Sequence, residues 1–203
     1  MIIFSILHNF LILFGSIYIG KTVIKKIVRN EYHRDNAYYD IIFSLIGISI
    51  ISIYIFVVTL TNLFIIPNII LINILLLSCA LKYLKTCFKK FIIKINKNHF
   101  FFLLFIIILV LISLLPPTDA DSLSYHLTIP KKIIYNKELI YNQLNYHEIF
   151  YGPGEAFFLV GLIFGNDLLP QFLNLISVLS IILIFSKTAK LNVNNNYNFK
   201  YLI

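Results

Sequence analysis

The sequence predicts an all-α, polytopic transmembrane protein of about six helices, with a polar outer loop that carries short interfacial helices. Of its 203 residues 59% are hydrophobic and 13% are charged, and the mean hydropathy is +0.86. The apolar residues form repeated runs, several of them close to the ~20 residues that a helix needs to cross a ~30 Å hydrocarbon layer. One long polar segment, residues 116–152, interrupts these runs. A soluble domain of this size has too little interior to bury so much apolar surface.

Six apolar runs follow one another along the chain. The first lies at the N-terminus, where no basic residue precedes the apolar core and no small-residue cleavage site follows it. We therefore interpret it as a retained membrane helix rather than a signal peptide. The runs cover residues 2–20, 41–60, 63–81, 99–115, 153–166 and 168–186.

Basic residues set the expected orientation of these helices. The formal net charge is +8, but most lysines and arginines lie in two loops, within residues 21–34 and 82–97. Such loops are typical of the cytoplasmic side of a membrane, and this placement argues against nucleic acid as the partner. The N-terminus and residues 116–152 are then expected on the outer face of the inner (cytoplasmic) membrane, in contact with membrane lipids.

The orientation of the chain after this outer segment has two interpretations. If residues 153–166 span the membrane, Asn166 and Asp167 form a tight cytoplasmic turn. The basic tail, residues 187–203, then lies outside, against the positive-inside rule. If residues 153–166 do not span, the tail is cytoplasmic.

The chain is expected to have three parts. Residues 1–98 form N-terminal transmembrane helices and basic cytoplasmic loops. Residues 99–186 comprise one helix, the outer loop and the following helices, and residues 187–203 form a tail. The last three residues, Tyr-Leu-Ile, could begin another span, which would make the sequence a fragment.

The stretch PPTDADSLSYHL, residues 116–127, concentrates polar side chains at the exit of an apolar run. Helix capping explains part of it, because the prolines end the preceding helix and Thr118 with Asp121 resembles a capping box. Capping needs only one acid, however, and does not require Tyr125 and His126 behind it. On a helix, Asp121 and Tyr125 would share a face.

This arrangement resembles the GT-C superfamily of integral-membrane glycosyltransferases, in its protein mannosyltransferase-like and aminoarabinose-transferase-like branches. In those branches the first outer loop carries Asp-Glu-x-x-Tyr. The string DSLSY at residues 121–125 keeps the Asp and the Tyr, while Ser122 replaces the Glu. The resemblance covers about residues 99–186. It implies the N-terminal portion of an enzyme that uses a polyprenyl-phosphate-linked sugar donor.

The resemblance also implies roles for residues of the outer loop. Asp121 takes the place of the catalytic acid, which would accept the proton of the acceptor hydroxyl as it attacks C1 of the sugar. Asp119 is a candidate second acid in place of the missing Glu. Lys131 and Lys132 are candidates to stabilise the departing lipid phosphate, with solvated or headgroup-facing lysines as the alternative.

Further polar residues are substrate-binding candidates. His126 and His147 could hydrogen-bond substrate, hold Mg²⁺ or Mn²⁺ with the two acids, or simply pack in the loop. Glu155 stands at the start of an apolar segment, where a carboxylate is costly unless it is paired or lines a polar cavity. Tyr125 and Tyr151 are candidates for stacking on sugar, although interfacial tyrosines are common in membrane proteins.

Polar residues inside the apolar runs are expected to form helix–helix hydrogen bonds rather than a transport path. They include His8, Asn9, Asn73 and Asn174. The sequence contains no P-loop, dinucleotide-binding, zinc-binding or nucleophile-elbow motif.

Two functional hypotheses follow. The first is a glycosyltransferase, or a fragment of one, that transfers sugar from a polyprenyl-phosphate-linked donor to an unknown acceptor on the outer face. The second is a non-catalytic polytopic protein, either a carrier or an envelope-assembly subunit. A carrier is expected to hold ionisable residues or broken helices near mid-membrane. The acids of this chain instead cluster at a helix exit, which favours the enzyme.

Overall fold

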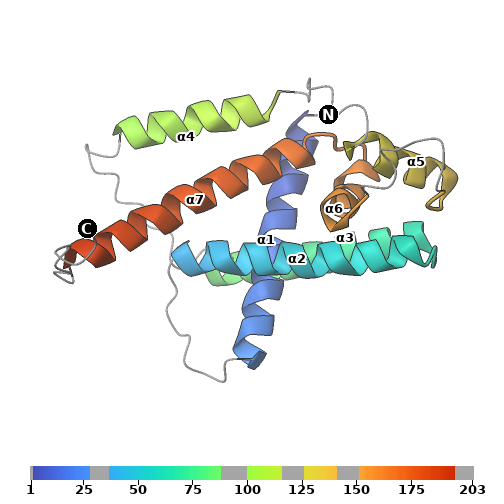
Figure 1. Cartoon of the computed structure of the whole chain (residues 1–203), viewed down its shortest axis with the longest axis horizontal. Coiled ribbons are helices and arrows are strands. Elements are labelled where there is room, and N and C mark those ends of the chain that lie inside the picture. Colours follow the sequence, from blue (N-terminus) through green and yellow to red (C-terminus); the bar gives the residue numbers. More distant parts are fainter. Residues whose placement is uncertain (1, 28–36, 88–99, 116–125, 141–150, 195–203) are drawn as a thin grey trace, which may run out of the picture.

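The computed structural model describes residues 2–27, 37–87, 100–115, 126–140 and 151–194. Within these residues all regular structure is helical and no strand occurs, which confirms the all-α prediction. The helices are shown in Figure 1. In chain order they are α1 (Ile2–Ile27), α2 (Ala37–Leu60), α3 (Ile65–Cys87), α4 (Phe100–Ser113), α5 (Thr128–Asn136), α6 (Pro153–Leu162) and α7 (Leu169–Asn194).

Three of the described helices, α1, α2 and α3, are long and apolar enough to cross a membrane. They have 26, 24 and 23 residues. At ~1.5 Å per residue each is about 35 Å long or more, which exceeds the ~30 Å hydrocarbon layer. The apolar parts of α4, α6 and α7 are shorter, at 10–17 residues. The structure therefore supports a membrane protein with three candidate spans, where the sequence predicts about six.

A tight turn joins α2 to α3. Asn62 and Phe64 both adopt positive φ angles, 50° and 45°, so the chain reverses within a few residues. The Asn68 side chain donates to the carbonyls of Leu63 and Phe64 at 3.0 and 3.1 Å. The Leu63 carbonyl would otherwise lack its helical partner, because Pro67 has no N–H to donate. These contacts fix α2 and α3 as a hairpin.

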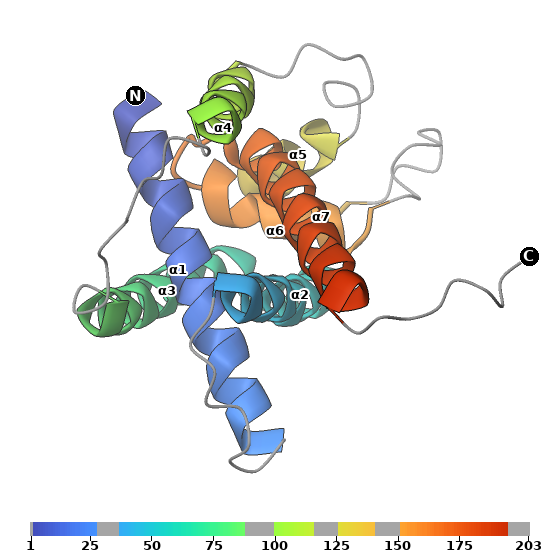
Figure 2. The same cartoon turned by 90° about the vertical axis from the view of Figure 1, so that its left-hand side faces the viewer.

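Helix α1 passes between α2 and α3 and crosses them, instead of running alongside (Figures 1 and 2). Small residues permit the close approach. A Cβ atom on Gly15 would lie 2.8 Å from a methyl carbon of Leu76 in α3. On the α2 side, a Cβ on Gly47 would overlap the backbone carbonyl of Ser16, and one on Gly20 that of Phe43. Glycine is required at these crossings because only hydrogen fits there.

Helix α6 differs most from its predicted state. The sequence predicts a span over residues 153–166, but α6 has ten residues, a length of about 15 Å, or half of a hydrocarbon layer. Its side chains Phe157, Leu159 and Val160 are at most 1% exposed and share one core with residues of α2 and α3. A run of this length is apolar because it lies in the protein interior, and such a run resembles a membrane segment in composition.

Helices α4 and α7 lie side by side over the rest of the molecule (Figures 1 and 2). In the part of α4 whose side chains are described, most of the apolar side chains are exposed, among them Leu104, Phe105, Ile108 and Leu111. A helix that is apolar all round is typical of contact with lipid or with other membrane segments.

Candidate functional site

The structure describes four of the eight residues that the sequence predicts as site residues. His126, Lys131, Lys132 and Glu155 lie in the described parts of the chain, at the starts of α5 and α6 or on α5 itself. The other predicted residues are outside the described residues: Asp119, Asp121, Tyr125 and His147.

Helix α5 is a short amphipathic helix inside the predicted outer loop. Pro130 occupies its first turn, where a proline removes no helical hydrogen bond, so it does not interrupt the helix that begins at Thr128. Ile129 and Ile133 are at most 4% exposed and join the core. Lys137 ends the helix in the left-handed conformation, with φ at 63°. One face of α5 is thereby fixed to the protein, and Lys131 and Lys132 remain exposed on the other.

Glu155 stands in the first turn of α6, which begins with Pro153 after an extended Gly152. The Gly152 N–H donates to Glu155 Oε2 at 3.0 Å. A glutamate at this position that accepts from the N-cap N–H forms half of a capping box. Its negative charge also lies at the positive end of the helix dipole. One oxygen of this carboxylate therefore stabilises the start of α6.

The other oxygen of Glu155 contacts His126, and this contact joins two of the predicted site residues. The distance from His126 Nδ1 to Glu155 Oε1 is 2.8 Å. The His126 side chain is 36% exposed and the Glu155 side chain 16%. Glu155 accepts the Gly152 N–H with its other oxygen, and a carboxylate oxygen can accept a bond from an imidazole N–H. A carboxylate that orients an imidazole in this way fixes both its tautomer and its ring direction.

Lys131 does not contact this pair. Its Nζ lies 3.1 Å from Asp167 Oδ2, and both side chains are about half exposed. Such an exposed ion pair contributes only about 0–1 kcal/mol, so it adds little stability. The ion pair instead shows which segments lie close together, because Asp167 follows the end of α6 and Lys131 lies on α5.

The two contacts of α5 and its N-terminal flank bear on the two interpretations of the chain after residue 152. His126 contacts the start of α6, and Lys131 contacts the turn between α6 and α7. Interpreting residues 153–166 as a span would place these two ends of α6 on opposite sides of a membrane. Both ends of α6 instead contact residues 126–131, which favours the interpretation in which residues 153–166 do not span.

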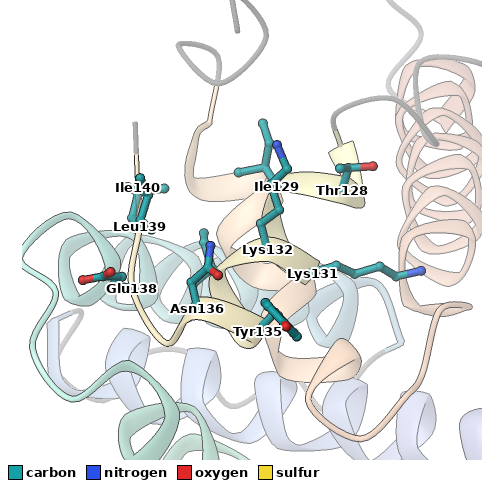
Figure 3. A pocket seen from close by; sticks show the side chains of 10 residues that line it. Thr128, Ile129, Lys131, Lys132, Tyr135, Asn136, Glu138, Leu139 and Ile140 are labelled. Atoms are coloured by element: carbon teal, nitrogen blue, oxygen red, sulfur yellow. The ribbon is translucent and has the colours of Figure 1, made fainter. Parts of the chain in front are cut away.

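A hollow of about 480 Å³ lies along α5, with Lys131 and Lys132 in its lining. Figure 3 shows the two lysines extending from α5 in different directions, so they do not converge on one point. Neither His126 nor Glu155 lines this hollow. Of the described candidates, the structure therefore brings His126 and Glu155 together and leaves Lys131 and Lys132 apart from them.

Tyr151, a candidate for stacking on sugar, is a core residue instead. Its side chain is 6% exposed, its ring packs against Phe56 at 5.8 Å between ring centroids, and its hydroxyl donates to Thr59 Oγ1 at 3.1 Å. In addition, Asn62 Oδ1 accepts a hydrogen bond from the Leu139 N–H at 2.8 Å. These contacts, which the sequence did not indicate, attach the polar segment to the α2–α3 end of the molecule.

No group of three or more His, Cys, Asp and Glu side chains that could hold a metal ion occurs in the portion of the chain that the structure describes. The predicted Mg²⁺ or Mn²⁺ ligands, Asp119 and Asp121, lie outside that portion. The metal therefore stays a prediction.

Comparison with known families decides what the chain belongs to. Residues 77–203, more than half of its length, match the family model described as the DUF1420 N-terminal domain. The chain belongs to the DUF1420 family. The DUF1420 match begins within α3 and includes α4 to α7, and so contains both His126 and Glu155. No curated protein and no solved structure matches this DUF1420 chain.

Proposed function

We propose that the chain is part of a membrane glycosyltransferase that moves a sugar from a polyprenyl-phosphate-linked donor to an acceptor at the outer face of the inner membrane. The observation that carries the proposal is the 2.8 Å contact between His126 Nδ1 and Glu155 Oε1. This contact supports a built polar site in a mostly apolar protein. The site directly follows Asp121 and Tyr125, the residues that resemble the GT-C motif.

The covalent chain keeps this pair within reach of the proposed catalytic acid. Asp121 precedes His126 by five residues, and five residues of chain span at most about 18 Å. Substrate held between the two would also lie near α5. The amphipathic α5 and the exposed apolar side chains of α4 suit a site that takes its donor from the lipid phase.

In the proposed reaction Asp121 acts as the general base. The acceptor hydroxyl oxygen forms a new bond to C1 of the sugar while the bond from C1 to the phosphate oxygen breaks. The proton of the acceptor passes to Asp121, and the bonding electrons leave with the lipid phosphate. Asp119 serves as the second acid. His126, held by Glu155, hydrogen-bonds the sugar or the acceptor, and Lys131 or Lys132 balances charge on the phosphate.

The alternative is a non-catalytic polytopic protein, and one observation favours it. Glu155 accepts the Gly152 N–H and caps α6, a role that is complete without any substrate. If the pair only fixes α6 against α5, its residues are needed for stability and no chemistry depends on them.

Replacing Asp121 distinguishes the glycosyltransferase from the non-catalytic polytopic protein. We expect Asp121→Asn, in the full-length protein in proteoliposomes, to lower the release of polyprenyl phosphate from supplied polyprenyl-phosphate sugars by about 10²–10⁴-fold. Membrane insertion should be unchanged. Glu138→Gln, an exposed carboxylate of the same segment, is the matched control and should retain activity. Full activity of Asp121→Asn would exclude the catalytic assignment. Absence of release by the wild-type protein, across a panel of hexose and pentose donors, would favour the non-catalytic alternative.

A further inference from the structure

A partly buried polar cluster lies where the first part of α1 meets α3 and the α6–α7 turn. It consists of His8 and Asn9 from α1, Asn73 from α3 and Asn166 from the turn. His8 Nε2 lies 3.0 Å from Asn73 Oδ1, and Asn166 Nδ2 lies 3.2 Å from His8 Nδ1. The predicted helix–helix hydrogen bond is therefore confirmed for His8 and Asn73, whereas Asn9 bonds to Asn166 in the α6–α7 turn. The catalytic proposal uses none of these residues.

Backbone groups fix the direction of the Asn73 side chain. Its Nδ2 donates to the carbonyl of Ile69 at 3.0 Å and to the carbonyl of Val160, in α6, at 3.2 Å. A carbonyl oxygen only accepts, so the amide nitrogen must face these two groups. The Asn73 oxygen then faces His8, and His8 Nε2 must donate to it.

The direction of Asn166 is fixed in the same way. Its Oδ1 accepts the N–H of Leu168 at 3.2 Å, and a backbone N–H only donates. Its Nδ2 donates to Asn9 Oδ1 at 2.7 Å. The second hydrogen of the amide faces His8 Nδ1 at 3.2 Å, which is closer than the Ser5 carbonyl at 3.5 Å. Asn166 is 0% exposed, so its amide has no access to water. His8 Nδ1 is consequently an acceptor.

These two constraints specify the state of His8. The ring is neutral, with its proton on Nε2. A protonated ring would carry a second N–H on Nδ1, directed at the amide nitrogen of Asn166, which is itself a donor. The other neighbours of the ring are Phe4, stacked at 5.7 Å, and Phe164, edge-on at 5.4 Å.

Within the part of the chain that the structure describes, no charged side chain hydrogen-bonds to the His8 ring. The side chains that hydrogen-bond to this ring or pack ring to ring against it are two asparagines and two phenylalanines. Asp167 follows Asn166 in the chain, but its carboxylate is engaged by Lys131. A charge placed among such neighbours is costly unless it is paired.

We propose that His8, Asn73 and Asn166 form a protonation-sensitive latch, which holds the α6–α7 turn against α1 and α3 while His8 is neutral and releases it when His8 is protonated. Asn73 also donates to the carbonyl of Val160 in α6. This bond and the bond from Nε2–H to Asn73 are the same in both states of His8, so protonation acts on the contact with Asn166 in the α6–α7 turn. The proposal does not depend on a catalytic role for the chain.

The tautomer is tested on the unmodified protein. The full chain is labelled with ¹⁵N-histidine, placed in lipid nanodiscs at neutral pH and examined by NMR, and the His8 signals are assigned by their loss in His8→Gln. We expect one protonated nitrogen, Nε2, and one bare nitrogen, Nδ1. A proton on Nδ1, or on both nitrogens, would overturn the latch.

The pH dependence of stability is the second test. Because the native structure accommodates only neutral His8 while the unfolded chain accepts a proton freely, the melting temperature should fall as the pH drops from about 8 to 5. His8→Gln cannot be protonated, and its amide can donate to Asn73 and accept from Asn166. This variant should lose the pH-dependent fall, whereas His126→Gln should retain it. An unchanged fall in His8→Gln would contradict the proposal.

A negative charge placed at position 166 should reverse or weaken the fall of the melting temperature with decreasing pH. In Asn166→Asp a carboxylate replaces the amide donor that faces His8 Nδ1, so protonated His8 gains an acceptor. We expect the melting temperature of this variant to rise, or to fall less, over the same drop in pH. A fall as steep as that of the wild-type protein would show that Nδ1 does not face position 166, and the latch would be rejected.

Discussion

The two carboxylate oxygens of Glu155 contact two different groups. One oxygen accepts the Gly152 N–H that begins α6, and the other accepts from His126. The sequence marks Glu155 and His126 as polar residues at the edges of apolar segments. Their contact could not be predicted, because 29 residues separate them and the packing of α5 on α6 brings them together. At the residue scale, the candidate site therefore depends on tertiary structure.

Replacing Glu155 tests how much of this arrangement depends on hydrogen bonding and how much on charge. Glu155→Ala removes both bonds, and we expect a loss of about 1–3 kcal/mol in the free energy of unfolding. Glu155→Gln keeps an acceptor for Gly152, and its amide can donate to the other tautomer of His126, so it should lose much less. Thermal unfolding in detergent measures both changes. An equal loss in the two variants would show that the negative charge itself holds the pair.

At the scale of helices, glycines determine how α1 fits between α2 and α3. Gly47 packs against the backbone of Ser16 and leaves no room for a side chain, whereas a Cβ on Gly154 in α6 would meet nothing within 4 Å. The sequence provides both glycines but does not distinguish them. Only the positions of the neighbouring helices show which one is sterically required.

The two glycines therefore form a matched pair for mutation. Gly47→Ala should destabilise the protein by about 1–3 kcal/mol, because the helices must move apart to accept the methyl group. Gly154→Ala should be neutral or slightly stabilising, since alanine favours the helical state. The midpoints of thermal unfolding of the two variants give the comparison. Equal midpoints would contradict the crossing of α1 and α2 at Ser16.

Helix α6 shows why the span count differs from prediction. Its residues are apolar because they are buried among α2, α3 and α7, and composition alone does not separate a buried helix from half of a membrane span. The length of the helix distinguishes a buried helix from a span, and only the structure gives this length. Helix α6 ends at Leu162, and Gly165 follows in the left-handed conformation with φ at 69°. The long runs, by contrast, are predicted well, since α1, α2 and α3 each contain the expected apolar core.

At the scale of the whole molecule, the N-terminal part of α1 and part of the polar segment, both of which the sequence places outside, contact the α6–α7 turn. The N-terminal part of α1 contacts the α6–α7 turn through Asn166, and the α2–α3 turn contacts Leu139 through Asn62. Lys131 adds the contact from α5 to Asp167. If α6 does not cross the membrane, α7 leads the basic tail towards the cytoplasm, in agreement with the positive-inside rule.

Thiol labelling in intact cells tests this arrangement most directly. Tyr135→Cys on α5 and Phe164→Cys in the α6–α7 turn are both exposed positions, at 87% and 46%. They are compared in a Cys87→Ser background that retains the buried Cys79, with Asn30→Cys in the first basic loop as the cytoplasmic control. Both test positions should react with a membrane-impermeant maleimide from outside, while Asn30→Cys reacts only after permeabilisation. Labelling of Tyr135→Cys and Phe164→Cys from opposite sides would show that α6 crosses the membrane, and would contradict the contact between Lys131 and Asp167.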